Sequence, residues 1–134
     1  YKEGLASAGL DFSPSLVVSL PEVSVSLGTS AALQMLDTSN PPDAFFTASD
    51  IFGIAVIRAA HKLGYRVPDD IAVIGFDNID ISSAITPPLT TINQSRAQLG
   101  FSACELLIKA LDGPLQGIKK IFLETELIIR DSAK

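Results

Sequence analysis

Three short apolar runs recur along the first part of the chain, at residues 16–20, 43–48 and 71–76. Each run is nearly continuous, as is typical of a strand buried on both faces of a parallel sheet. The runs start roughly 27 residues apart, and the segments between them show helical periodicity. This order predicts an α/β fold with an open, mainly parallel sheet and helices on both of its faces.

The helical segments carry apolar residues three or four positions apart. Residues 24–38 predict one helix and residues 51–63 a second, which either Ser49 or Asp50 can cap. Residues 94–111 predict a third, strongly amphipathic helix, which ends at an Asp-Gly-Pro sequence. Each helix therefore presents an apolar face that has to pack against another part of the protein.

The remaining segments complete the pattern. Residues 1–9 predict the end of a preceding helix, residues 79–88 a loop or short helical turn, and residues 89–93 a short strand. Between residues 119 and 131 apolar and polar side chains alternate, which predicts a late strand at an edge of the sheet.

Composition narrows the class of protein. The chain has 134 residues, enough for one domain, and its hydrophobic content of 47% indicates a packed core. No apolar run reaches the roughly 20 residues of a membrane span. The net charge is −5, and apart from Lys119 and Lys120 the basic residues are scattered singly, which argues against contact with a nucleic-acid backbone. The single cysteine, Cys104, excludes an internal disulfide. The chain lacks an initiator Met and a signal peptide and opens within a helical pattern, so we expect a fragment of a longer protein.

The carboxyl ends of the predicted strands mark the expected binding site, because ligands of open α/β folds bind there. These ends bring together polar residues (Ser49, Asp50, Asp77 and Asn78) and two aromatic residues (Phe46 and Phe76). Such a mixture favours a small polar ligand with an apolar face, such as a sugar or a nucleobase. A purely structural interpretation is the alternative, in which Asp50 caps its helix and Asp77 stabilises a turn. We favour the structural role for Asp50 and ligand binding for Asp77.

Catalytic and metal-binding patterns are sparse. The one histidine, His61, lies on a predicted helix away from the strand ends, so no Ser-His-Asp or Cys-His arrangement can form there. Asp50 and Asp77 alone offer too few ligands for a metal ion, and no glycine-rich phosphate loop follows any strand. We therefore predict a binding protein rather than an enzyme, with no metal and no cofactor.

Several motifs resemble the effector-binding core of LacI/GalR-type transcription regulators. They are the Pro-x-Ala-x-Phe strand, the Ser-Asp helix start, "GYRVPDDIAVIGFDN" and "PPLTTINQ", with Gly100 and the closing "LIIRDS". The resemblance implies a periplasmic-binding-protein-like fold, in which the ligand binds in a cleft between two α/β subdomains. Residues 1–134 would be a fragment of this effector-binding domain. Residues 1–92 and 119–134 would then belong to the C-terminal subdomain, and residues 93–118 to a crossover segment of the N-terminal subdomain.

The resemblance also assigns ligand-binding positions to Asp77, Phe46, Ser49 and Gln94. Asp77 matches the family aspartate that hydrogen-bonds the effector, and Phe46 a position where some members stack an aromatic ring on the ligand. Gln94 matches a residue at the edge of the cleft. Ser49 stands where sugar-binding members often carry Asn, and a hydroxyl group cannot make the paired donor and acceptor contacts of an amide.

The implied function is sensing of a small polar effector, such as a sugar or nucleoside, by a cytoplasmic, homodimeric repressor. DNA would bind through an N-terminal helix-turn-helix domain that this segment lacks, and no contact with a membrane is expected. The alternative is a periplasmic sugar-binding protein of an ABC-type transporter, which shares the fold.

Overall fold

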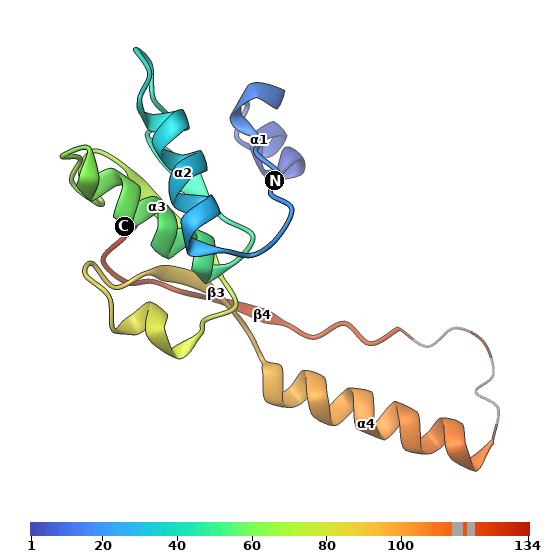
Figure 1. The fold of residues 1–134 in the computed structure, drawn as a ribbon. Helices are drawn as coiled ribbons and strands as arrows, with labels where there is room; N and C mark the ends of the chain where they lie inside the picture. Colours follow the sequence, from blue (N-terminus) through green and yellow to red (C-terminus); the bar gives the residue numbers. More distant parts are fainter. Residues whose placement is uncertain (114–116, 118–119) are drawn as a thin grey trace.

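The computed structural model describes residues 1–113, 117 and 120–134, and its centre is an open mixed sheet (Figure 1). Within these residues the sheet has the strand order β1-β2-β3-β4. The strands are β1 (Ala44–Phe46), β2 (Ala72–Phe76), β3 (Thr90–Gln94) and β4 (Thr125–Ile128). Strands β1, β2 and β3 run parallel, and β4 is antiparallel to β3. The predicted α/β class with a mainly parallel sheet is confirmed, and so is the late edge strand.

Four helices accompany the sheet in the described part of the chain: α1 (Lys2–Ser7), α2 (Val25–Leu36), α3 (Asp50–Lys62) and α4 (Arg96–Asp112). The chain also forms two short 3-10 helices, η1 (Pro14–Leu16) and η2 (Asp80–Ser83). Helix α2 packs against α3, and α3 packs on β1 and β2. The helices predicted over residues 24–38 and 51–63 are thus present, the first with shorter bounds and the second shifted by one residue towards the N-terminus.

Serine caps and close backbone packing explain why these two helices form and meet. The side chains of Ser24 and Ser49 each accept a hydrogen bond at 3.5 Å, from the backbone N–H groups of Leu27 and Phe52. Gly28 allows α2 to approach α3 closely, since a Cβ atom there would lie only 2.8 Å from the Cβ of Ala55.

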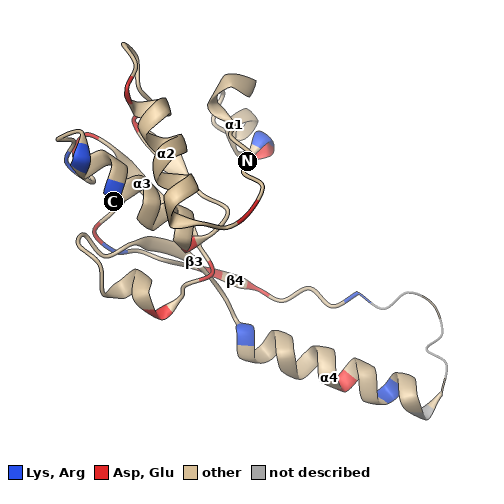
Figure 2. Cartoon of the chain, in the orientation of Figure 1, with Lys and Arg blue, Asp and Glu red and all other residues tan. Residues whose placement is uncertain are grey.

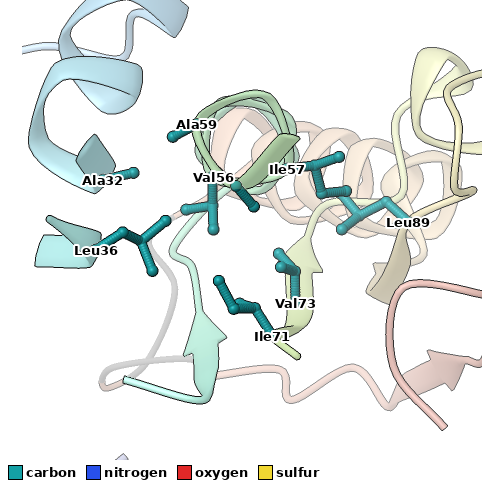
Figure 3. Packing of buried hydrophobic residues seen from close by; sticks show 9 residues of the cluster. Ala32, Leu36, Val56, Ile57, Ala59, Ile71, Val73 and Leu89 are labelled. Carbon is teal, nitrogen blue, oxygen red and sulfur yellow. The ribbon is translucent and has the colours of Figure 1, made fainter. Parts of the chain in front are cut away.

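The core lies between α2, α3 and the side of the sheet that faces them (Figure 3). Its larger side chains are at most 5% exposed: Leu36, Val56, Ile57, Ile71, Val73 and Leu89. Burial of an aliphatic side chain of this size contributes about 1.5–3 kcal/mol. This packing fixes β2 against α3 and therefore determines where β2 ends.

The prediction of a strand over residues 16–20 is wrong. Pro14–Leu16 form η1, and residues 17–20 belong to no strand of the described sheet. Proline fixes its own φ and lacks an N–H, which favours the tight turn. Val17 and Val18 stay 47% and 49% exposed, so this apolar run does not enter the core. An apolar run becomes a strand only when neighbouring strands pair with it.

Helix α4 projects away from the sheet (Figure 1). It begins at Arg96 rather than at the predicted residue 94, because Asn93 and Gln94 still pair with β4. Large apolar side chains of α4 are exposed to solvent: Leu99, Phe101, Leu107, Ile108 and Leu111. Residues 114–116 and 118–119, part of the predicted crossover and late strand, lie outside the described residues.

Candidate functional site at the ends of β2 and β3

Asp77 occupies a turn at the carboxyl end of β2. Its backbone N–H still donates to the carbonyl oxygen of Ile92 on β3, at 2.9 Å. Asp77 and Asn78 then adopt positive φ values of 106° and 50°. Such conformations cost side-chain-bearing residues about 1–3 kcal/mol each and persist only where surrounding contacts enforce them. The turn therefore directs the Asp77 side chain away from the regular path of the strand.

Gln94 lies next to Asp77. It ends β3, and its Nε2 donates a hydrogen bond to Asp77 Oδ1 at 2.7 Å. Both residues are half-buried. Within the described residues Asp77 Oδ2 makes no hydrogen bond, so this carboxylate oxygen can accept one from a ligand hydroxyl or N–H group. The structure thus brings two of the four predicted site residues into direct contact.

Phe46 and Ser49 lie one strand away from this pair. Phe46 ends β1 and is 55% exposed, which leaves its ring free to stack on a ligand. Ser49 is buried as the N-cap of α3, where its hydroxyl accepts the N–H of Phe52. A hydroxyl group that caps a helix keeps its own proton and can still donate one hydrogen bond.

Asp50 has a structural role, but not as the helix cap, so that part of its interpretation is wrong. Its side chain is fully buried. Thr91 Oγ1 donates to its Oδ1 at 2.5 Å, and the N–H of Ile79 donates to its Oδ2 at 2.8 Å. The carboxylate therefore ties the start of α3 to β3 and to the turn that follows Asp77.

Gly75 makes room for this carboxylate. A Cβ atom at Gly75 would lie 2.8 Å from Leu89 Cδ2 and still closer to Asp50 Oδ1. Gly75 is also in register with Thr91, the residue that donates to Asp50. Gly75, one residue before the end of β2, thus leaves the space in which β2, β3 and the start of α3 meet.

Arg130, which follows β4, contacts the turn, and sequence reasoning did not identify it. Its Nη2 donates to Asn78 Oδ1 at 2.7 Å, and the Asn78 amide donates in turn to Asn93 Oδ1 at 3.3 Å. The signal in the sequence was the "LIIRDS" motif, which contains Arg130 but does not indicate which residues it contacts.

A groove lies beside Gln94. Its volume is about 190 Å³, and it lies between the start of α4 and the segment that leads into β4. The groove is lined by Gln94, Ser95, Leu99, Ile121, Leu123, Glu124 and Thr125. A larger open depression of about 620 Å³ lies at the N-terminal end, beside Tyr1 and Phe12, and contains none of the predicted site residues.

Comparison with known proteins identifies the family. A family model described as "Periplasmic binding protein-like domain" matches residues 1–133. The chain belongs to this family. The relatives also bear out the resemblance to LacI/GalR-type regulators.

This periplasmic-binding-protein-like chain is 34% identical to the HTH-type transcriptional regulator CelR of Thermobifida fusca over 98% of its own length and 38% of that protein. It is 35% identical to the HTH-type transcriptional repressor CytR of Escherichia coli, over its full length and 39% of that protein. Among solved structures, a CelR–cellobiose complex matches 99% of the chain with a TM-score of 0.91 and 34% identity, over 40% of that chain. A LacI-family regulatory protein from Chloroflexus aggregans matches 98% of the chain with a TM-score of 0.87 and 30% identity, over 47% of that chain.

The chain therefore spans about two fifths of the length of these curated relatives. The relatives are transcription regulators, as the motifs predicted. In the described part of the chain, no helix is both long and apolar enough to cross a membrane.

Proposed function

We propose that this chain is the effector-sensing part of a LacI/GalR-type transcription regulator, and that Asp77 hydrogen-bonds a small polar effector. The observation that carries the proposal is the Asp77 turn. It presents a half-buried carboxylate with one free oxygen at the edge of the sheet where open α/β folds bind ligands. A carboxylate in this setting suits the hydroxyl groups of a sugar or nucleoside, and the CelR relative was solved with cellobiose.

Phe46, Ser49 and Gln94 complete the proposed site. The exposed ring of Phe46 offers a stacking surface for the apolar face of a sugar or nucleobase. Gln94 holds one oxygen of Asp77, which leaves the other free to accept a hydrogen bond from the ligand. Ser49 can contribute its hydroxyl proton to the ligand, because capping of α3 uses only an acceptor position of the oxygen.

Residues 1–92 and 119–134 form the C-terminal subdomain in this proposal, and residues 93–118 cross to an N-terminal subdomain. The projection of α4 and its exposed apolar residues support this division, because such a surface is normally buried against another part of a protein. A ligand bound between the subdomains would favour their closed arrangement by its differential affinity, typically with about 1–3 kcal/mol of coupling.

DNA binding belongs to another part of the parent protein in this proposal. The net charge of the chain is −5, and Figure 2 shows Lys and Arg interspersed with Asp and Glu along the described chain. The named relatives are HTH-type proteins, which supports a helix-turn-helix domain outside these residues. The proposal includes a cytoplasmic homodimer, as the resemblance to LacI/GalR-type regulators implies, and regulation without enzymatic activity is the proposed role. The relatives favour this role over that of a transporter binding protein.

Calorimetric titration of the full-length protein tests the proposal, with cellobiose, ribose and cytidine as probes. We expect at least one probe to bind and Asp77→Ala to raise its Kd about 10- to 100-fold, since a hydrogen bond to a charged group contributes about 1.5–3 kcal/mol. Asp80→Ala is the matched control, because Asp80 is an exposed carboxylate three residues further on. Equal Kd values for wild type and Asp77→Ala would refute the site, and no binding of any probe would refute the effector class.

A further inference from the structure

Arg130 connects the residues after β4 to the turn that carries Asp77. Its backbone is anchored on Thr90, whose Oγ1 accepts the N–H of Arg130 at 2.9 Å and donates to its carbonyl oxygen at 3.1 Å. The guanidinium then donates through Nη1 to Leu89 O at 2.7 Å and to Ser82 Oγ at 3.0 Å. Its Nη2 donates to Asn78 Oδ1 at 2.7 Å. One half-buried side chain thus binds three points around the turn.

All three acceptors of the guanidinium are neutral, and in the described part of the chain no carboxylate forms an ion pair with Arg130. Hydrogen bonds from a charged donor are shorter and stronger than those between neutral groups. The hydrogen bond from Arg130 Nη2 to Asn78 Oδ1 therefore determines how the Asn78 amide is oriented. With its oxygen on Arg130, its nitrogen points to Asn93 Oδ1 at 3.3 Å.

Asn78 and Asp77 both have positive φ, so surrounding contacts have to hold the turn in this conformation. The orientation of the Asn78 amide determines which of these contacts can form. Three consecutive N–H groups of the turn each reach a different partner. Asp77 donates to Ile92 O at 2.9 Å, Asn78 to Thr91 Oγ1 at 3.4 Å, and Ile79 to Asp50 Oδ2 at 2.8 Å. Arg130 adds a side-chain contact from the segment after β4, through Nη2 to Asn78 Oδ1, and so helps to hold the strained turn.

We propose that Arg130 is a positioning residue for the effector site: it holds the Asn78 amide and thereby fixes the Asp77 carboxylate, without touching the ligand itself. This inference rests on the proposed function, in which Asp77 binds the effector. The chain leaves the sheet through β3 towards α4 and returns through β4, which Arg130 follows. In this proposal the effector site therefore depends on residues of both connections, Gln94 at the end of β3 and Arg130 after β4.

Residue-resolved hydrogen–deuterium exchange on the full-length protein tests the positioning role without any ligand. Arg130→Met keeps most of the side-chain volume and removes the donors. We expect it to accelerate exchange of the N–H groups of Asp77, Asn78 and Ile79 about tenfold, while the amides in the middle of α3 keep their wild-type rates. Arg130→Lys should give a smaller acceleration, because an ammonium group cannot form the forked contacts of a guanidinium. Unchanged rates in the turn, or an equal acceleration throughout α3, would overturn the inference.

Calorimetry with cellobiose, or with ribose or cytidine where that probe binds the wild type instead, provides the functional readout. We expect Arg130→Met to raise the Kd about tenfold, and Asn78→Gly, which keeps the positive φ but removes the amide, to do the same. The double variant should then be no weaker than the weaker single variant, because both changes remove one interaction. Weaker binding by Asp77→Ala with full binding by Arg130→Met would refute this inference alone. If Asp77→Ala binds normally, or if cellobiose, ribose and cytidine all fail to bind, the effector assignment fails, and the exchange rates still decide whether Arg130 holds the turn.

Discussion

Replacing Gly75 by alanine would push a methyl group into the space that Asp50 occupies. The new Cβ would lie 2.8 Å from Leu89 Cδ2 and closer still to the Asp50 carboxylate, so both side chains have to move. Overpacking of a core costs about 1–3 kcal/mol. Displacement of Asp50 also weakens its bonds from Thr91 and Ile79, and each hydrogen bond to a buried charged group contributes about 1.5–3 kcal/mol. We expect Gly75→Ala to reduce the free energy of unfolding by about 3 kcal/mol or more.

Urea denaturation followed by circular dichroism measures this change as a lower midpoint at an unaltered slope. Gly100→Ala is the matched control, because Gly100 lies inside α4 with no atom within 4 Å of its added Cβ. There the same methyl group should stabilise the protein by about 0.5–1 kcal/mol through helix propensity. A loss below about 1 kcal/mol for Gly75→Ala would contradict the close packing of Asp50 against β2.

Two further predictions concern the surface. The hydrogen bond from the Arg66 guanidinium lowers the pKa of Asp70 from 3.8 to about 2, so the stabilisation by this pair is complete above pH 4 and lost as the pH falls through 2. Denaturation of wild type and Asp70→Asn between pH 5 and pH 2 should show a difference that shrinks with acidity, and a constant difference would contradict it. The isolated segment of residues 1–134 should self-associate through the exposed residues of α4, among them Leu107 and Leu111, which are 61% and 79% exposed. Light scattering that finds a monodisperse monomer would refute this, whereas replacement of both leucines by serine should reduce the association.

The outcome for the three apolar runs shows what local pattern can predict. The runs at residues 43–48 and 71–76 form β1 and β2, which pair with each other in parallel. The run at residues 16–20 has similar composition but forms no strand in the described chain. An apolar run records a tendency to be buried, whereas a strand also requires a partner, which lies elsewhere in the sequence.

The sequence indicated candidate site residues but not the contacts that they make. Asp77 was recognisable because it ends an apolar run, and family resemblance added Gln94. The bonds that hold the turn join residues far apart in the chain. Thr91 and Asp50 are 41 positions apart, and Arg130 and Asn78 are 52 apart. No periodicity or local motif contains such pairings, which depend on the register between strands.

The pairing of β3 with β4 has a mechanical consequence. Gln94 is paired with Thr125, so the chain leaves the sheet and re-enters it at adjacent points. Any movement of the part attached through α4 is therefore passed to the sheet through two paired strands, β3 and β4. Gln94, the last residue of β3, lies at the start of this connection and is one hydrogen bond from Asp77. In the proposed function, Gln94 is therefore both the neighbour of the carboxylate that binds the effector and the residue at which the chain leaves the sheet.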